Sequence, residues 1–372
     1  MGKVLVIDDD RTIRMLLKLI LNKAGHVVLE AFDAKTGLSV AEIESPDLIL
    51  LDLMLPDING LNLLNAIKSN EWLKKIPIIV LTGSTDQENK LVALRSGAVD
   101  FITKPFLHEE VLLRVNTQLK LHSLINSLEN AVSHLEKDLM AASRIQKSLI
   151  PSYPPEGYFD EIHWIYEPSH KVGGDIFDII PIDDNSVLLY VADIAGHGVN
   201  AAMLSVIVHR FIEDYCDNHP DFELSNFMLE LDRNFRFNDF TLFFTITAAL
   251  FHRESKTLEL TNAGHPAPLL IKDDMLELKE PAESIIGIDM LEGNTKCYTI
   301  SPGARLFLYT DGVTEAANDR GQLFGSERLM KSLFEQRNFQ LKEQLENVFN
   351  KLKTFTGNNE FEDDISIIGI QF

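Results

Sequence analysis

Residues 187–198 have the sequence Val-Leu-Leu-Tyr-Val-Ala-Asp-Ile-Ala-Gly-His-Gly, an apolar run that favours a buried strand and that ends in an aspartate and glycines. Three other segments also place a carboxylate at or near the end of a strand-like run: Gly173-Gly174-Asp175 with Asp178 beyond it, Thr310-Asp311-Gly312, and Asp363-Asp364-Ile365-Ser366. Carboxylates at strand ends can converge on hard divalent cations such as Mg²⁺ or Mn²⁺. Two such ions can activate a water and bind a phosphoryl group. We therefore predict a metal-phosphate site in the C-terminal half.

The chain has 372 residues, enough for two or more domains with cores of their own. Its net charge of −22 argues against nucleic acid as a partner, because binding of phosphate backbones requires clustered Lys and Arg. Bound metal ions would still let an acidic enzyme bind phosphate. With no leader and no apolar run that could span a bilayer, we expect a cytoplasmic protein without a membrane partner. Cys216 and Cys297 form no ligand pattern and are expected to be free thiols.

Residues 1–119 alternate short apolar strands with amphipathic helices, which predicts a doubly wound α/β fold. Continuous Val/Ile/Leu runs suit a parallel sheet that is buried on both faces. The expected strands are Lys3–Ile7, Val27–Ala31, Asp47–Leu51, Ile76–Leu81 and Val99–Ile102.

Polar residues follow these strands at the carboxyl edge of the expected sheet. Asp8, Asp9 and Asp10 follow the first strand, Asp52 the third, Thr82 the fourth, and Lys104-Pro105 the fifth. Clustered carboxylates repel one another unless a cation neutralises them, which predicts a Mg²⁺ site. The simpler alternative is that Asp8–Asp10 only cap the following helix.

This constellation, with Asp52-Leu53-Met54-Leu55-Pro56 and Gly60 beyond, resembles the receiver domain of bacterial response regulators, which has a flavodoxin-like fold. The resemblance implies that Asp52 accepts a phosphoryl group from a histidine kinase. It implies Mg²⁺ bound by Asp8, Asp9, Asp52 and the carbonyl of Met54. It also implies a switch formed by Thr82, Lys104 and Phe101, the last standing where tyrosine is common.

Residues 120–150 have apolar side chains in alternating steps of four and three, which predicts a helical linker that forms a coiled coil. The positions are Leu121, Ile125, Leu128, Val132, Leu135, Leu139, Ala142, Gln146 and Leu149. We favour a homodimer through residues 121–149, in which the polar Gln146 could set the register. The alternative is a single amphipathic helix packed on its own C-terminal domain. Prolines from Pro151 onward would end the helix.

Residues 151–372 combine runs of strands with separate helices, which predicts an α+β fold, a two-sheet αββα arrangement. We expect strands at Val187–Ala192, Phe243–Phe251, Thr257–Asn262, Leu269–Lys272, Arg305–Tyr309 and Ile365–Phe372. Helices are expected near 199–216, 224–235, 326–336 and 340–354.

The four acidic motifs, together with Arg144–Pro151 and Asn262-Ala263-Gly264-His265-Pro266, resemble the SpoIIE/RsbU-like branch of the PP2C protein phosphatases. The resemblance implies two Mn²⁺ or Mg²⁺ ions that activate a water for attack on phosphoserine or phosphothreonine. The implied ligands are Asp175, Asp193, Asp311 and Asp363, with Asp178 and the Ile194 carbonyl as additional or water-mediated contacts.

Four other residues of this region receive smaller roles. Position 176 is Ile where the branch usually has an aromatic, which we expect to be a tolerated packing change. His197 is not assigned as a general acid, because it lies four residues after Asp193 rather than two. His265 is expected to be a hydrogen-bonding loop residue, since histidine is a poor partner for Mg²⁺. Lys171 could hold substrate phosphate or be a solvated lysine.

The order of receiver, helix and phosphatase resembles RssB-type regulators of pseudomonads and implies a phosphorylation-controlled phosphatase. The implied substrate is a phosphorylated STAS-type anti-sigma-factor antagonist in a partner-switching pathway of stress control. The alternative is a non-catalytic adaptor that sequesters a sigma factor or antagonist. A nucleotide cyclase is disfavoured, because Ile176-Phe177 replaces the acidic-aromatic pair which that chemistry requires.

Overall fold

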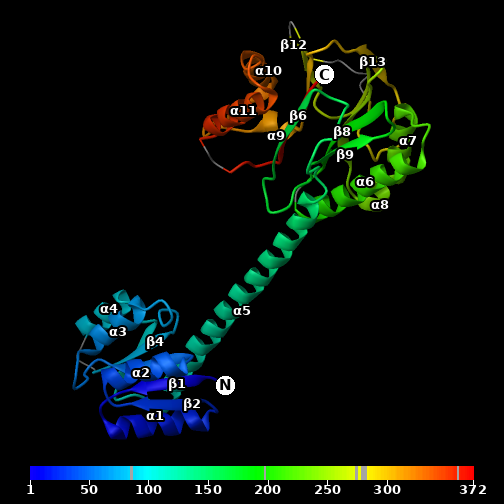
Figure 1. Ribbon diagram of the computed structural model, residues 1–372. Coiled ribbons are helices and arrows are strands. Elements are labelled where there is room, and N and C mark those ends of the chain that lie inside the picture. The colour runs from blue at the N-terminus through cyan, green and yellow to red at the C-terminus, as the bar shows by residue number, and fades with distance from the viewer. Residues whose placement is uncertain (84–86, 197, 273–274, 278–282, 358–359) are drawn as a thin grey trace. The chain divides into compact units, whose positions relative to one another are not determined.

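The computed structural model describes residues 1–83, 87–196, 198–272, 275–277, 283–357 and 360–372 (Figure 1). Two compact units divide the chain, Met1–Leu135 and Glu136–Phe372. The division falls within one continuous helix, α5, which runs from His108 to Lys147. The sequence predicted domain limits at 1–119, 120–150 and 151–372. Because the compact units divide within a single helix, these limits remain predictions.

The first unit is a doubly wound α/β domain, as predicted. Its parallel sheet has the order β2-β1-β3-β4-β5. The strands are β1 (Lys3–Ile7), β2 (Val27–Ala31), β3 (Leu48–Asp52), β4 (Ile78–Gly83) and β5 (Asp100–Lys104); the helices before α5 are α1 (Arg11–Lys23), α2 (Ala34–Glu44), α3 (Gly60–Ser69) and α4 (Gln87–Arg95). Apolar side chains of α2, α3 and α4 cover one face of the sheet. Those of α1 and the start of α5 cover the other.

The second unit packs two antiparallel sheets face to face, as predicted. One sheet has the order β13-β10-β9-β8-β7 and the other β12-β11-β14-β15-β6. The strands are β6 (Glu161–Glu167), β7 (Ile176–Pro181), β8 (Ser186–Ile194), β9 (Phe244–His252), β10 (Thr257–Ala263), β11 (Leu269–Ile271), β12 (Met275–Glu277), β13 (Lys296–Thr299), β14 (Arg305–Tyr309) and β15 (Ile365–Gln371). A core of apolar side chains from both sheets lies between them.

Helices cover the outer faces of the two sheets. The first sheet packs against α6 (Val199–Asn218) and α7 (Leu224–Asn234), with α8 (Phe237–Phe240) beside them. The second packs against α9 (Asp311–Glu315), α10 (Gly325–Glu335) and α11 (Leu341–Phe355). The result is the expected αββα arrangement (Figure 1).

Four strands were not predicted from the sequence, β6, β7, β12 and β13, and each of them is an edge strand. Edge strands are buried less completely, so they lack the continuous apolar run that reveals a central strand. In β6, with sequence Glu-Ile-His-Trp-Ile-Tyr-Glu, only Ile162 is buried.

The helix α5 has an apolar stripe on its surface over much of its length. Leu121, Ile125, Leu128, Val132 and Leu135 are each between 47% and 66% exposed. No helix among the described residues is both long and apolar enough to cross a membrane. Both cysteines are free, with Cys216 buried and Cys297 exposed.

Candidate functional site

The first unit gathers its polar residues at the carboxyl ends of its parallel strands. Asp8, Asp9 and Asp52 each offer a carboxylate oxygen within 4.8 Å of the others. Lys104 Nζ lies 2.7 Å from Asp8 Oδ2 and 2.7 Å from Asp52 Oδ2. Burial and the nearby Asp52 raise the pKa of Asp8, although Lys104 opposes this rise. One lysine does not neutralise three carboxylates, so the donor set fits a hard divalent cation such as Mg²⁺.

The loops around this cluster hold its shape. Asp10 caps the N-terminus of α1, as the simpler alternative predicted. Its carboxylate accepts a hydrogen bond of 2.7 Å from the Thr12 amide. Asp8 does not share that role, because it is fully buried and bound to Lys104. Gly60 lies against the carbonyl of Asp52, where a Cβ atom would collide with it. The exposed Met54 donates its amide to Asp52 Oδ1 at 3.3 Å.

The remaining predicted receiver residues lie on β4 and β5. Thr82 is 2% exposed in β4, and its hydroxyl donates weakly to the Gly83 carbonyl. Phe101 in β5 is half-buried, with Lys90 and Arg114 5.2 and 5.8 Å from its ring centroid. Parallel neighbours pair Thr82 with Thr103, which places Thr82 beside the end of β5 that carries Lys104.

In the second unit, the ends of four strands bring the acidic motifs together. Asp193 lies near the end of β8, and Asp175 immediately precedes β7, whose Ile176 pairs with Ala192. Asp311 begins α9 after β14, and Asp363 precedes β15 on the neighbouring strand. The segments thus approach from both sheets. Only Asp311 follows its strand, whereas Asp193 lies within β8, and Asp175 and Asp363 precede β7 and β15.

These carboxylates shift one another's protonation. Burial raises the pKa of Asp193 to about 7, with further contributions from Asp311, Asp363 and other nearby carboxylates. Burial, Asp193 and Asp364 raise the pKa of Asp175 well above its usual value. Burial raises the pKa of Asp311 as well. Such a concentration of carboxylate charge is the environment that oxygen-preferring divalent cations stabilise.

Buried hydroxyl and amide donors fix two of the carboxylates. Asp175 accepts hydrogen bonds from the hydroxyls of Thr310 at 2.8 Å and Ser366 at 2.6 Å. Asp364 lies beside the predicted ligand Asp363, and the sequence predicted no role for it. Its side chain accepts hydrogen bonds from the amides of Ser169 at 2.7 Å and Gly174 at 2.6 Å. It is a positioning residue for the loop before Asp175, a role that sequence spacing alone does not reveal.

Glycines are required where these loops cross. A Cβ atom on Gly174 would lie 2.7 Å from the Ile194 carbonyl oxygen, which shows how closely the two segments approach. A Cβ atom on Gly312 would collide with the Asp364 carbonyl. The Ile194 carbonyl is therefore near the Asp175 loop, as its predicted role requires.

Asp178 is not brought into this cluster by any contact that we observe. It lies on β7 opposite Tyr190 and faces His209 and Glu213 of α6. Ile176 on the same strand is 1% exposed and packs into the core beneath α6, in keeping with the packing role expected for this position.

The other predicted residues have local partners. His197 falls outside the described residues. His265 Nδ1 lies 2.7 Å from Thr245 Oγ1, and its backbone amide donates to Asn262 Oδ1, in keeping with a loop hydrogen-bonding role. Lys171 Nζ is 3.4 Å from Glu136 Oε1.

Gln146 lies inside the second unit rather than on the exposed stripe of α5. Its side chain is 3% exposed. Its Nε2 donates to the Gly173 carbonyl at 2.6 Å and to Ser205 Oγ at 3.1 Å. The Gly173 amide donates back to Gln146 Oε1 at 3.0 Å. The last turn of α5 is thus fastened directly to the loop that carries Asp175.

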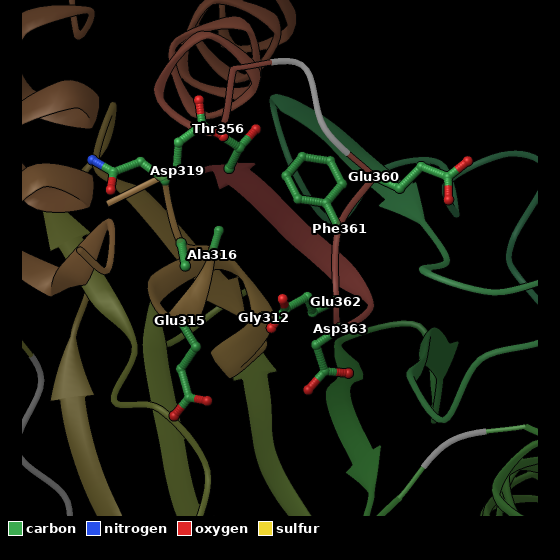
Figure 2. Close-up of a pocket in the computed structure, with 11 residues that line it drawn as sticks. Gly312, Glu315, Ala316, Asp319, Thr356, Glu360, Phe361, Glu362 and Asp363 are labelled. Atoms are coloured by element: carbon green, nitrogen blue, oxygen red, sulfur yellow. The ribbon is translucent and has the colours of Figure 1, made fainter. Parts of the chain in front are cut away.

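A pocket borders the carboxylate cluster on the side of the second sheet. Figure 2 shows Glu315 and Asp363 among its lining residues, with Gly312 of α9 near the segment before β15 that carries Asp363. Glu315 also raises the pKa of Asp311. The pocket gives the acidic cluster an opening to solvent.

Two family models match the chain. The model of Stage II sporulation protein E matches residues 183–372, and that of the response regulator receiver domain matches residues 4–116. Among curated proteins, the chain is 39% identical over 117 residues to the phosphate regulon regulator PhoB of Pseudomonas aeruginosa, covering 32% of this chain and 51% of that protein. It is 38% identical over 118 residues to the regulator PhoP of Bacillus subtilis, covering 32% and 48%. The chain thus spans about half the length of these relatives.

Two solved structures share the fold of the second unit. The SiaA-PP2C domain of Pseudomonas aeruginosa superposes with a TM-score of 0.59 at 24% identity, covering 65% of this chain and 98% of that one. The RsbU and RsbW domains of a Mycobacterium tuberculosis protein superpose with a TM-score of 0.50 at 18% identity, covering 60% and 61%. The chain therefore belongs to the Stage II sporulation protein E family through its PP2C-like C-terminal half, and it carries a response regulator receiver domain at its N-terminus.

Proposed function

We propose that this chain is a two-component response regulator in which phosphorylation of Asp52 controls a metal-dependent protein serine/threonine phosphatase. The observation that carries the proposal is the convergence of Asp175, Asp193, Asp311 and Asp363 from four separate segments, where burial and neighbouring carboxylates raise the pKa values of Asp175, Asp193 and Asp311. Turn and cap residues would not need to lie so close together that Asp311 and Asp363 raise the pKa of Asp193.

Asp175, Asp193, Asp311 and Asp363 would hold two Mn²⁺ or Mg²⁺ ions, with the Ile194 carbonyl near enough to assist. When bound, such ions supply an activated water and neutralise charge on the phosphoryl group. The residues of the chain perform the positioning: Thr310 and Ser366 hold the Asp175 carboxylate, and Asp364 holds its loop. The four-segment arrangement favours an enzyme over a sequestering adaptor.

In the receiver, Asp52 would accept the phosphoryl group from a histidine kinase while Asp8, Asp9, Asp52 and the Met54 carbonyl bind Mg²⁺. Lys104 already contacts Asp52 and would contact a phosphoryl oxygen there. Thr82 and Phe101, on the adjacent strands β4 and β5, would report the change as the switch.

The route from receiver to phosphatase would run through α5. Its first turns pack in the receiver core through Val111 and Val115. Its last turn bonds to Gly173 through Gln146. A shift or rotation of this helix would therefore move the loop that presents Asp175, which is the kind of two-state element that a switch requires.

The exposed stripe of α5 supports the proposed homodimer. Five apolar side chains from Leu121 to Leu135 lie at coiled-coil spacing with large exposed fractions, and a second copy of the helix would cover them. Because Gln146 is buried in the second unit, the paired segment would end before it, and Gln146 would serve the active-site loop rather than the register.

The substrate that we propose is a phosphorylated STAS-type anti-sigma-factor antagonist. This proposal rests on the membership of the C-terminal half in the Stage II sporulation protein E family and on its earlier resemblance to RsbU-like phosphatases.

The experiment is Mn²⁺-dependent release of phosphate from p-nitrophenyl phosphate, with wild type compared with Asp193→Ala. We expect hydrolysis by the wild type that chelation abolishes and that Asp193→Ala lacks. Full Mn²⁺-dependent activity in Asp193→Ala would show that the site assignment is wrong.

A further inference from the structure

The face of the first sheet that lies under α6 carries a second cluster of ligating groups, separate from the carboxylates of the proposed phosphatase centre. It consists of Asp178 on β7 with His209 and Glu213 on α6. One ring nitrogen of His209 and one oxygen from each carboxylate lie within 4.8 Å of one another. His209 and Glu213 are four residues apart, so they project from the same side of the helix.

The distances within this cluster are too long for hydrogen bonds, and they end on the two different ring nitrogens of His209. His209 Nε2 is 3.6 Å from Glu213 Oε1, and His209 Nδ1 is 3.8 Å from Asp178 Oδ2. A hydrogen bond between such atoms requires about 3.2 Å or less. Two ligands at about 2.0–2.1 Å from a tetrahedral ion are separated by roughly 3.3 Å. His209 Nε2 and Glu213 Oε1 are close to that separation, whereas Asp178, whose Oδ2 lies 3.8 Å from Nδ1, would have to turn toward Nε2 to join them.

Neighbouring groups leave the coordinating atoms available. Tyr190 Oη lies 2.8 Å from His209 Nδ1, and when that nitrogen donates its proton to Tyr190, the Nε2 lone pair points toward Glu213. This arrangement resembles the outer partners that orient histidine ligands in metal proteins. The other charged neighbour, Arg210, pairs with Glu213 Oε2 at 2.6 Å, which leaves Oε1 facing His209.

Burial favours the neutral form of the His209 imidazole, the form that binds metal ions. The His209 side chain is 3% exposed, and that of Asp178 is 15% exposed. Burial also lowers the pKa of His209 and raises the pKa of Asp178 to about 6. A buried neutral imidazole between two carboxylates is a donor set that borderline ions such as Zn²⁺ accept and that Mg²⁺ disfavours.

We propose that Asp178, His209 and Glu213 form a binding site for a divalent transition metal of the Zn²⁺ class, distinct from the phosphatase centre. Three protein ligands leave a fourth position open to water. The ion would fasten α6 to β7.

The test is Co²⁺ titration of the untagged full-length chain in excess Mg²⁺, followed by visible absorption. Co²⁺ with a histidine ligand in a four- or five-coordinate site absorbs strongly, whereas six-coordinate oxygen sites absorb weakly. We expect one strongly absorbing Co²⁺ per chain, displaced by Zn²⁺, in the wild type and in Asp193→Asn. The control variant Asp214→Asn removes an exposed carboxylate one residue from Glu213 and should keep the signal.

Glu213→Gln and His209→Gln should both lose the absorption. Glu213 is partly exposed, so its variant keeps the test valid even where substitution of the buried histidine disturbs folding. An unchanged titration in Glu213→Gln, a signal that disappears in Asp193→Asn, or no strong absorption in the wild type would each overturn the proposal.

Discussion

At the scale of single residues, the environment of Asp193 makes its negative charge unfavourable unless a cation is bound. Burial and neighbouring carboxylates raise its pKa to about 7. An unfolded chain releases this proton near pH 4, so the folded state binds the proton more tightly between those values. The contribution of Asp193 to stability is therefore present at low pH and is lost as pH rises toward 7.

We predict that, without metal at pH 7.5, the wild type unfolds at a lower temperature than Asp193→Asn. The difference in the free energy of unfolding should be at most about 4 kcal/mol. The difference should shrink as pH falls toward 5, and Mn²⁺ should stabilise the wild type more than Asp193→Asn at pH 7.5. Calorimetry with and without chelator measures this. A metal-free wild type that is more stable than Asp193→Asn at pH 7.5 would contradict the electrostatic account.

Asp364 provides a second prediction at this scale. Its buried carboxylate accepts hydrogen bonds from Ser169 and Gly174, and an amide group offers one acceptor oxygen instead of two. Asp364→Asn should lower the free energy of unfolding by about 2 kcal/mol and weaken Mn²⁺ binding. The exposed neighbour substitution Glu362→Gln should change stability little. Chemical denaturation measures the free energy of unfolding of both variants. Equal stability of Asp364→Asn and Glu362→Gln would contradict the positioning role of Asp364.

The sequence identified which side chains belong to the two sites better than it identified which of them contact one another. Asp8, Asp52 and Lys104 converge as expected, because parallel strands align their carboxyl ends at one edge. Asp178 does not join the other motif carboxylates, because it lies on the face of β7 that packs beneath α6, which only the strand's orientation reveals. The motif carboxylates Asp363 and Asp364 are adjacent, and burial alone distinguishes the exposed one from the buried one.

At the scale of elements, central strands and long helices followed from hydrophobic pattern, whereas edge strands did not. The strand expected at Arg305–Tyr309 is β14 with the same limits, because it is apolar and lies between two neighbours. The strand β6 escaped prediction because its charged ends and partial exposure interrupt the pattern. For α5, heptad spacing was visible, but the change of environment at Gln146 depends on tertiary contacts.

Gln146 carries the prediction for the end of α5. Gln146→Ala removes both hydrogen bonds to Gly173, so the Asp175 loop loses its attachment to the helix. We expect Mn²⁺-dependent hydrolysis to fall about tenfold or more, with Mn²⁺ affinity reduced as well. The adjacent exposed substitution Ile145→Ala is the control and should retain activity. Wild-type rates and Mn²⁺ affinity in Gln146→Ala would show that this attachment does not support the site.

The stripe on α5 gives a prediction about assembly. Leu128→Glu places a charge in the middle of the proposed dimer seam and should convert a dimer to a monomer. Ser133→Glu adds the same charge to the same helix outside the seam and should leave the dimer intact. Sedimentation equilibrium distinguishes the species. A wild type that is monomeric at concentrations where coiled coils pair would rule out the homodimer.

At the scale of the whole molecule, one helix belongs to both compact units. It begins in the receiver core and ends hydrogen-bonded to the Asp175 loop. The proposed control of the phosphatase by Asp52 can therefore pass along the chain through a change in the position, pairing or order of α5. This control can be measured.

The most direct test follows Mn²⁺-dependent hydrolysis by the full-length chain with and without beryllofluoride, a mimic of the phosphoryl group on Asp52. The account predicts that beryllofluoride changes the rate in wild type, leaves the rate of Asp52→Ala unchanged, and produces no activity in Asp193→Ala. Equal rates with and without beryllofluoride in wild type, under conditions where it occupies the receiver, would contradict receiver control.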